Sequence, residues 1–307
     1  MPLPKSNWIW FNGKFVPWNE ANVHVTAHVL HYGSSVFEGL RAYATPKGPA
    51  VLGLPQHLRR LFDSCKIVRL AIPYTFEQLH DAILETVRRN EHQSCYIRPL
   101  VFRGAGNFSL DGRECPSEVV IITFEWGRYL GSDAIEQGVD VNISSWRRIA
   151  PDTMPMMAKA GGNYLNAQFV AMEAKEYGFV EGIALDVQGY VGEGSGENIF
   201  VVSRGKIYTP PVGASILMGI TREFVLTLAK EFGYEVKEQL IPRELLYIAD
   251  EVFFTGTAAE ITPIRSIDHI EIGNGKRGPI TQRLQEAFFG IVNGEIPDKY
   301  GWLTFVS

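Results

Sequence analysis

Apolar residues in the first half of the chain recur at two spacings, one typical of helices and one of strands. Trp8 to Phe11 and Lys14 to Val16 favour strands, and they flank Asn12-Gly13, a strong signal for a two-residue hairpin turn. Helices are predicted over His57 to Ala71 and Phe76 to Asn90, and further strands over Tyr96 to Phe102 and Val119 to Phe124. The first half therefore has a mixed α+β pattern.

The periodicity breaks near Trp126, where two glycines follow within five residues and indicate a connection between domains. Beyond it, strands are predicted over Val139 to Ser144, Gly182 to Asp186, Asn198 to Val202 and Glu251 to Thr255, and helices over Asn163 to Tyr177, Thr221 to Phe232 and Ile280 to Ile291. We therefore expect a small N-terminal α/β domain (residues 1–126), a connection (residues 127–135) and a large C-terminal domain (residues 136–307).

Composition narrows the class of protein. Hydrophobic residues make up 46% and charged residues 21% of the 307 residues, which is typical of soluble globular proteins. The net charge of -5 gives no general attraction for nucleic acid or an anionic membrane. The 3 cysteines show no Cys-x-x-Cys spacing, so neither a disulfide framework nor a zinc site is expected. With no signal-peptide pattern at the N-terminus, a cytoplasmic protein is expected.

Lys159 has unusual surroundings for a lysine. It is the only charged residue from Thr153 to Met172. Burial in apolar surroundings disfavours the ammonium form, and a neutral amine can attack a carbonyl and form a Schiff base. A lysine whose stem packs while its head reaches water would fit the same composition, and it is the commoner case.

A glycine-rich segment, Gly192 to Asn198, is the second candidate. It is not a dinucleotide fingerprint, because Glu197 stands where the third glycine would fall. Its glycines permit a ligand to approach the backbone closely, and the carboxylate of Glu193 would project into that space. A turn with a solvated glutamate is the alternative.

Two further segments could cradle an anion. Gly219-Ile220-Thr221 precedes a predicted helix, and Gly256-Thr257-Ala258-Ala259 follows a predicted strand, so backbone N–H groups and hydroxyls could face a phosphate. Arg60 could add a bidentate guanidinium. Taken singly, each is equally an ordinary helix cap or a surface arginine.

Metal and hydrolase chemistry find little support. His24, His28 and His31 have a helical spacing, but the β-branched residues around them disfavour a helix and no carboxylate or thiolate completes a ligand set, so no metal is expected. Ser195 lacks the flanking glycines of a nucleophile elbow, and no phosphate-binding G-x-x-x-x-G-K-[ST] loop occurs.

Five segments in one order resemble the branched-chain amino acid aminotransferases, which are fold type IV pyridoxal-phosphate enzymes. These segments are Tyr32 to Arg41, Ala158 to Tyr164, Glu193 to Phe200, Leu217 to Arg222 and Thr255 to Ile261. The resemblance runs from about Trp8 to Trp302, and the shared order is far more specific than any single motif. It implies an α+β, D-amino acid aminotransferase-like fold, with a small α/β domain, a larger β-barrel-like α/β domain and the cofactor at their interface.

The resemblance also implies residue roles. Lys159 would carry pyridoxal 5′-phosphate as a Schiff base and later shuttle a proton, Glu193 would pair with the pyridine nitrogen, and Tyr164 would hydrogen-bond the phenolic oxygen. Other cofactor contacts would come from Arg60, Leu217, Gly219, Ile220, Thr221, Gly256 and Thr257. Substrate contacts would come from Tyr32, Phe37, Gly39, Arg41, Tyr96, Arg98, Trp126, Tyr129, Tyr164, Thr257, Ala258 and Ala259.

The implied pocket must accept two kinds of side chain in successive half-reactions. Apolar walls suit leucine, isoleucine and valine, whereas Arg98 with Tyr32 would take the distal carboxylate of glutamate. The loop from Gly104 to Cys115 falls where family members vary and often reaches the neighbouring subunit's pocket, so Phe108 and Arg113 could tune substrate range. Amino acids and 2-oxo acids are the implied partners, and the implied assembly is a homo-oligomer with a dimer as its smallest unit and a hexamer as a larger form.

Related activities remain open. A D-amino acid aminotransferase, an (R)-amine aminotransferase or an aminodeoxychorismate lyase would share the fold. The Phe37 to Arg41 run and the Gly256 to Ala259 run favour the branched-chain enzyme. A binding protein that has lost its cofactor is the alternative from another class, and Lys159 and Glu193 argue against it.

Overall fold

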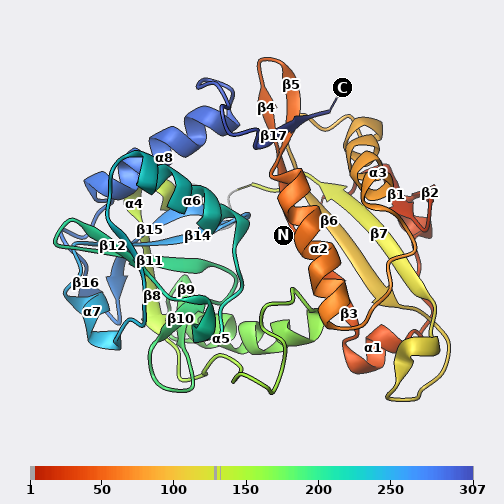
Figure 1. Cartoon of the computed structure of the whole chain (residues 1–307), viewed down its shortest axis with the longest axis horizontal. Coiled ribbons are helices and arrows are strands. Elements are labelled where there is room, and N and C mark those ends of the chain that lie inside the picture. The colour runs from red at the N-terminus through yellow and green to blue at the C-terminus, as the bar shows by residue number, and fades with distance from the viewer. Residues whose placement is uncertain (1–3, 128–129, 132, 307) are drawn as a thin grey trace. The chain divides into compact units, whose positions relative to one another are not determined.

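The computed structural model describes residues 4–127, 130–131 and 133–306 (Figure 1). The chain forms two compact units: unit 1 comprises Met1–Trp126, Ala158–Gly162 and Gly290–Ser307, and unit 2 comprises Gly127–Met157 and Asn163–Phe289. The contiguous division expected from the sequence placed Ala158–Gly162 and Gly290–Ser307 in the C-terminal domain. The structure differs because backbone hydrogen bonds tie both segments to unit 1.

Within the described residues, unit 1 holds an 8-stranded antiparallel sheet with the order β17-β5-β4-β6-β7-β1-β2, and β3 pairs with β6 beside this path. Its strands are β1 (Trp8–Phe11), β2 (Lys14–Pro17), β3 (Ser35–Phe37), β4 (Leu40–Thr45), β5 (Gly48–Leu52), β6 (Cys95–Arg103), β7 (Ser117–Phe124) and β17 (Leu303–Phe305). Its helices are η1 (Trp18–Glu20), α1 (His28–Tyr32), α2 (Leu54–Ile67), α3 (Phe76–Arg89) and η2 (Gly112–Glu114), where η marks a 3-10 helix.

Local sequence explains several of these elements. The hairpin predicted around Asn12-Gly13 is confirmed, and both turn residues have positive φ, as a two-residue turn of this kind requires. Helix α3 begins with a capping box in which Thr75 and Gln78 each bond the other's backbone N–H. Helix α2 starts and stops earlier than expected, and the backbone leaves helical geometry at Arg69, where φ is 54°.

Two predictions for unit 1 need correction. A short helix does form at α1, although β-branched neighbours were expected to prevent one. It has 5 residues and ends at Gly33 in the left-handed conformation. The β4–β5 hairpin and β17 were missed because Gly48, Pro49 and Ala50 have weak strand propensity. Strand β17 pairs with a neighbour that lies far along the chain.

Within its described residues, unit 2 holds a 9-stranded mixed sheet with the order β10-β9-β8-β15-β14-β11-β12-β13, and β16 pairs with β15. Its strands are β8 (Val139–Ile143), β9 (Glu181–Leu185), β10 (Val191–Gly194), β11 (Asn198–Ser203), β12 (Lys206–Thr209), β13 (Val236–Glu238), β14 (Glu251–Gly256), β15 (Glu260–Ile267) and β16 (Ile270–Glu271). Its helices are α4 (Ala134–Gln137), α5 (Tyr164–Glu176), η4 (Val212–Ala214), α6 (Ile220–Glu231), α7 (Arg243–Tyr247) and α8 (Pro279–Val292), while η3 (Gly161–Asn163) crosses the boundary between the units.

Each unit has its own apolar core. In unit 1, α2 and α3 pack on the sheet through Leu58, Leu61, Leu79 and Ile83. The core of unit 2 comes from its strands, including Val141, Ile183, Ile199, Val201 and Phe254. In the part of the chain that the structure describes, every helix is too short or too polar to cross a lipid bilayer.

Candidate active site

Lys159 lies in the segment Ala158–Gly162, which belongs to unit 1. Its backbone N–H donates to Ser64 Oγ at 3.0 Å, and its carbonyl oxygen accepts from the Phe37 N–H at 3.1 Å. Its Nζ lies 5.0 Å from the centre of the Phe37 ring. Helix α2 and strand β3 therefore hold the lysine backbone from two sides.

Two glycines make this close approach possible. A Cβ on Gly161 would lie 2.2 Å from Ser35 Oγ, and a Cβ on Gly39 would lie 1.9 Å from the hydroxyl of Tyr96. Neither position has room for a side chain. The glycines let the lysine segment and the strand ends lie against one another without a gap.

An aromatic and cationic group lies on the same unit. The guanidinium carbon of Arg98 is 4.5 Å from the centre of the Phe37 ring and 5.3 Å from that of Tyr96, and Arg98 Nη2 donates to the Tyr96 hydroxyl at 3.3 Å. Among the described residues, Arg98 Nε is buried without a hydrogen-bond partner. Tyr96 packs edge-on against Trp126 at 4.8 Å, and Arg41 Nη2 donates to the Trp126 carbonyl at 3.3 Å.

A buried charged group lies next to this one. The Glu38 side chain is 1% exposed, and its Oε1 accepts from Arg60 Nε at 2.6 Å, while its Oε2 accepts from Arg60 Nη2 at 2.9 Å and from His57 Nδ1 at 2.7 Å. Burial raises the pKa of the Glu38 carboxyl, but the charge of Arg60 and the hydrogen bonds from Arg60 and His57 outweigh burial and hold that pKa well below its usual range. Glu38 is therefore ionised at neutral pH.

His57 responds in the opposite sense to its surroundings. Burial lowers the pKa of its imidazole, and the cations of Arg60 and Lys159 act in the same direction against the raising effect of Glu38. The ring is therefore neutral at neutral pH, and its Nδ1 carries the hydrogen donated to Glu38. Neither Glu38 nor His57 was given a role from the sequence, because the two lie 19 positions apart on different elements.

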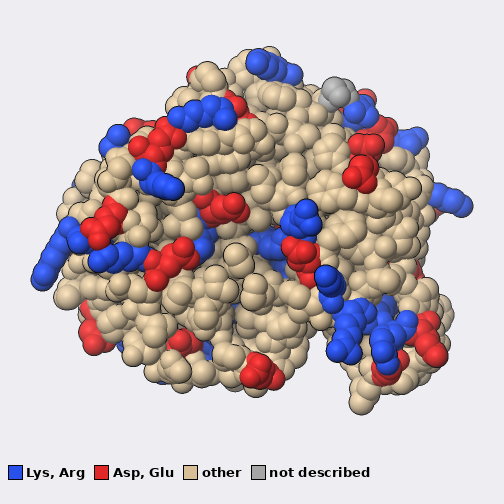
Figure 2. All heavy atoms as spheres, viewed as in Figure 1, with Lys and Arg blue, Asp and Glu red and all other residues tan. Residues whose placement is uncertain are grey.

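Tyr32 lies on another part of unit 1. Among the described contacts, its hydroxyl donates to the Phe108 carbonyl at 3.1 Å and its ring lies 4.6 Å from His28, so the structure groups it with the Gly104 to Cys115 loop and not with Arg98. A cavity of about 380 Å³ opens beside it. Figure 2 shows basic side chains gathered in the region of α1, and Arg69, Arg103 and Arg113 line this cavity.

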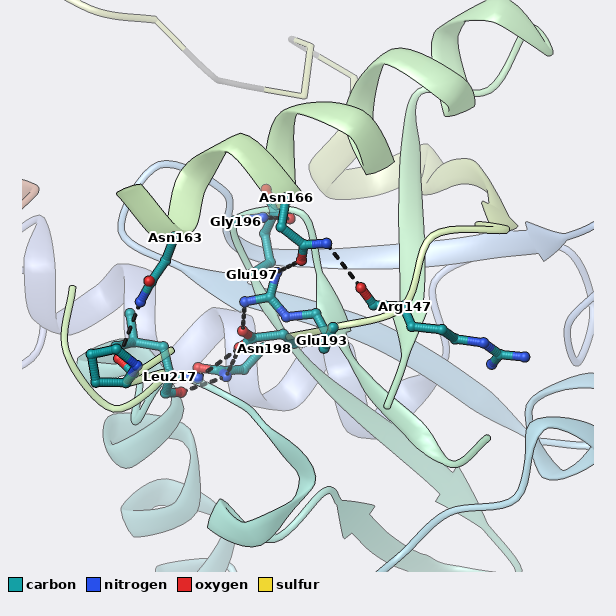
Figure 3. A network of polar contacts seen from close by, with 10 residues as sticks. Arg147, Asn163, Asn166, Glu193, Gly196, Glu197, Asn198 and Leu217 are labelled. Atoms are coloured by element: carbon teal, nitrogen blue, oxygen red, sulfur yellow. Dashed lines mark hydrogen bonds and ion pairs between the residues drawn. The ribbon is translucent and has the colours of Figure 1, made fainter. Parts of the chain in front are cut away.

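Glu193 is the centre of a polar network in unit 2 (Figure 3). It lies on β10 and is 5% exposed. Its Oε1 accepts from Arg148 Nη2 at 2.6 Å, and its Oε2 accepts from Asn198 Nδ2 at 3.0 Å and from the Leu217 N–H at 3.1 Å. Arg148 also reaches Asn166 Oδ1 at 3.3 Å. The carboxylate is thus held by one cation and two neutral donors.

Arg148 was not singled out from the sequence. It follows Arg147 in an ordinary polar stretch, and no motif marks it. A signal did exist at Gly192, because a Cβ there would lie 2.9 Å from the Ala184 carbonyl oxygen and 3.0 Å from Arg148 Cγ. The glycine allows the arginine side chain to lie against the strand.

The start of α6 forms an anion-binding geometry. Gly219 is the N-cap, and the first N–H groups of the helix, at Ile220 and Thr221, have no acceptor within the helix. A Cβ on Gly219 would lie 2.0 Å from Asn198 Oδ1. Helix α6 packs on β14, where Thr255 Oγ1 is buried and has no hydrogen-bond partner among the described residues. These donors suit a phosphate.

The remaining predicted positions fall on one unit or the other. Unit 1 carries Tyr32, Phe37, Gly39, Arg41, Arg60, Tyr96, Arg98, Trp126 and Lys159. Unit 2 carries Tyr164, Glu193, Leu217, Gly219, Ile220, Thr221, Gly256, Thr257, Ala258 and Ala259. Tyr164 begins α5, and Gly256 ends β14 with Thr257 directly after it. Tyr129 lies outside the described residues.

Known proteins share this fold and sequence. Residues 35–267 match the family model described as amino-transferase class IV. The chain is 51% identical to the branched-chain-amino-acid aminotransferase of Escherichia coli K12 over 100% of both chains. It is 46% identical to the Pseudomonas aeruginosa enzyme of the same name over 97% of each chain.

Solved structures give the same result. A branched-chain amino acid aminotransferase from Escherichia coli matches with a TM-score of 0.97 at 51% identity, over 99% of this chain and 100% of that one. The branched-chain aminotransferase of the archaeon Thermoproteus uzoniensis, solved with norvaline, matches with a TM-score of 0.94 at 45% identity, over 99% and 100% of the two chains. The fold class predicted from the motifs is confirmed by these matches.

One further solved structure bears on the cofactor. It is a branched-chain amino acid aminotransferase, from the source abbreviated T.th., complexed with N-(5′-phosphopyridoxyl)-L-glutamate. It matches with a TM-score of 0.95 at 46% identity, over 99% of this chain and 100% of that one. The bound molecule joins a phosphopyridoxyl group to glutamate, so that relative holds both the cofactor's ring and an amino-acid substrate.

Proposed function

Because this chain belongs to the class IV aminotransferase family, we propose that it transfers amino groups between branched-chain L-amino acids and 2-oxoglutarate, with pyridoxal 5′-phosphate as its cofactor. The family predicted from five sequence motifs is thereby confirmed. The observation that carries the substrate assignment is the full-length identity of 51% to an enzyme with this name. The related lyase and D-amino acid or (R)-amine activities are not favoured.

The residues of unit 2 fit the cofactor. The first turn of α6 and the buried Thr255 hydroxyl offer donors to its phosphate, and Gly219 leaves the space that a Cβ would fill. Glu193 offers an ionised carboxylate to a protonated ring nitrogen. The cation of Arg148 favours the ionised form of that carboxylate.

When bound, pyridoxal 5′-phosphate supplies a ring that withdraws electrons from the substrate's α-carbon, so that a proton can leave that carbon. Lys159 holds the cofactor through its Nζ and, once the substrate has taken its place, moves the proton to and from the α-carbon. The backbone bonds to Ser64 and Phe37 fix where the lysine begins, which limits the positions that Nζ can reach.

Unit 1 supplies both kinds of substrate contact. The Phe37 ring offers an apolar surface to a branched side chain, and the guanidinium of Arg98 beside it offers a partner for the distal carboxylate of glutamate. Arg98 covers the aromatic face when no carboxylate is present, so its charge does not face an apolar side chain without compensation.

The proposed substrate range is tested by initial rates with 2-oxoglutarate and a panel of amino donors. Isoleucine, leucine and valine should react at least about tenfold faster than D-alanine or (R)-phenylethylamine, a difference of roughly 1.4 kcal/mol in activation free energy. D-Alanine or (R)-phenylethylamine as the best donor would assign the chain to another activity of the same fold.

Location and assembly complete the proposal. We infer that the enzyme acts in the cytoplasm as a homo-oligomer with a dimer as its smallest unit. The exposed Phe108 and Leu110 side chains of the Gly104 to Cys115 loop support the assembly, because a second copy could cover them. Light scattering on the eluting protein would give the number of subunits, and a monomer at micromolar concentration would contradict it.

A further inference from the structure

Glu38, His57 and Arg60 form a buried charged cluster in unit 1. His57 and Arg60 lie three positions apart on α2, so their side chains leave the helix on one face, toward Glu38 at the end of β3. Their side chains are 3%, 12% and, for Glu38, 1% exposed. A buried ion pair of this kind adds little net stability, because desolvation offsets the attraction. Its retention therefore points to another role.

The cluster fixes the direction of one guanidinium. Both oxygens of Glu38 bind Arg60, at 2.6 Å through Nε and at 2.9 Å through Nη2, so one edge of the planar group is held. The opposite edge, which carries Nη1, then has a set direction as well. His57 holds Glu38 in turn through a bond of 2.7 Å and prevents the carboxylate from rotating.

The same corner of unit 1 holds Lys159. Phe37, directly before Glu38, donates its N–H to the Lys159 carbonyl, and Ser64, one turn after Arg60 on α2, accepts from the Lys159 N–H. The charge of Lys159 also acts on His57. The lysine that would bind the ring and the arginine that could bind the phosphate are therefore placed by one rigid corner.

We propose that Glu38, supported by His57, is a positioning residue that orients Arg60 for the phosphate of pyridoxal 5′-phosphate and so sets cofactor affinity without touching the cofactor. The proposal rests on the proposed function. An arginine held in its binding orientation loses less freedom when the phosphate arrives, and this raises affinity. Glu38→Gln removes the charge and one of the two strong bonds while it keeps the size of the side chain.

The test uses two probes that differ only in the phosphate. Apoprotein is prepared from the parent and from Glu38→Gln, and dissociation constants are measured by absorbance for pyridoxal 5′-phosphate and for pyridoxal. The constant for pyridoxal 5′-phosphate should rise at least about tenfold in Glu38→Gln, whereas that for pyridoxal should stay within about twofold. Glu251→Gln is the matched control, because Glu251 is a buried carboxylate that caps α8 in unit 2. It should change neither constant.

A second variant tests whether the effect passes through Arg60. Adding Glu38→Gln to Arg60→Met should weaken binding no further than Arg60→Met alone, since no guanidinium is left to orient. His57→Asn keeps the Glu38–Arg60 pair and should give a smaller, equally phosphate-selective loss. It serves as the test if Glu38→Gln does not fold.

Three results would overturn the inference. They are an unchanged constant for pyridoxal 5′-phosphate, equal losses for both probes, and additive losses in the double variant, which would indicate a purely structural cluster. These differ from failure of the proposed function. In that case the parent apoprotein itself would bind neither probe, and both proposals would fall.

Discussion

At the residue scale, the chemistry depends on charged side chains whose partners are fixed by the protein. Glu193 is held by Arg148, Asn198 and Leu217, and Glu38 by Arg60 and His57. Lys159 is held through its backbone, which leaves its side chain to act. Each reactive group therefore begins from a set position, and this preorganisation lowers the barrier that it must cross.

Arg98 carries the prediction on dual substrate recognition. Arg98→Met removes the charge and keeps an apolar stem, so the half-reaction with glutamate should weaken by about 2–4 kcal/mol, the usual effect of losing a charge-assisted pair in a desolvated site. The half-reaction with isoleucine should change far less. Stopped-flow measurement of both half-reactions on one variant decides it, with Tyr96→Phe as the control for loss of the neighbouring hydroxyl. Equal losses on both substrates would return Arg98 to a structural role.

Single residues could be predicted where the sequence itself was unusual. Lys159 is the only charge from Thr153 to Met172, and the glycines around Glu193 and at Gly219 indicate close approaches. Glu38, His57 and Arg148 could not be predicted in the same way. Their partners lie 19 to 45 positions away on other elements, so nothing in the adjacent sequence reports the contact.

At the element scale, the start of α6 joins the anion site to the Glu193 network. Gly219 caps the helix and touches Asn198, which donates to both Glu193 and the Leu217 carbonyl. A change at this one helix end therefore affects both places. The helix itself was predicted within one residue of its ends, because its apolar spacing is regular.

Gly219→Ala tests this connection. The backbone at this position has φ of -72°, which alanine adopts without strain, but its Cβ would lie 2.0 Å from Asn198 Oδ1 and would force that side chain to turn. Affinity for pyridoxal 5′-phosphate should fall by about tenfold or more, measured on the apoprotein, with little change in melting temperature. Gly213→Ala is the control, since a Cβ there meets nothing within 4 Å. Matching affinities for the two variants would show that the contact is unimportant.

Other elements escaped the sequence because their strands are held by neighbours and not by propensity. Strand β10 is Val-Gly-Glu-Gly, and β5 begins with Gly-Pro-Ala, yet both pair with adjacent strands. Their burial comes from the sheet around them. The hairpin at Asn12-Gly13 was predictable for the opposite reason, since its two turn residues alone specify the geometry.

At the scale of the whole molecule, the two units are not contiguous along the chain. Strand β17, at the C-terminal end, pairs with β5, and Val36 forms a bridge with Ala160. Pairings over such separations depend on tertiary contacts that local periodicity does not record. The five motifs predicted the family because they describe a shared fold, whereas the discontinuous division of the chain required the structure.

The central claim is that this chain transaminates branched-chain amino acids by means of Lys159. The most direct measurement supplies only isoleucine and 2-oxoglutarate to the enzyme loaded with pyridoxal 5′-phosphate, and follows both products. The account predicts glutamate and the 2-oxo acid of isoleucine in equal amounts, unchanged in the control Lys175→Ala at an exposed position of α5. In Lys159→Ala the rate should fall by orders of magnitude, because both the covalent attachment and the proton shuttle are lost. A Lys159→Ala enzyme that still forms glutamate near the parent rate would contradict the claim.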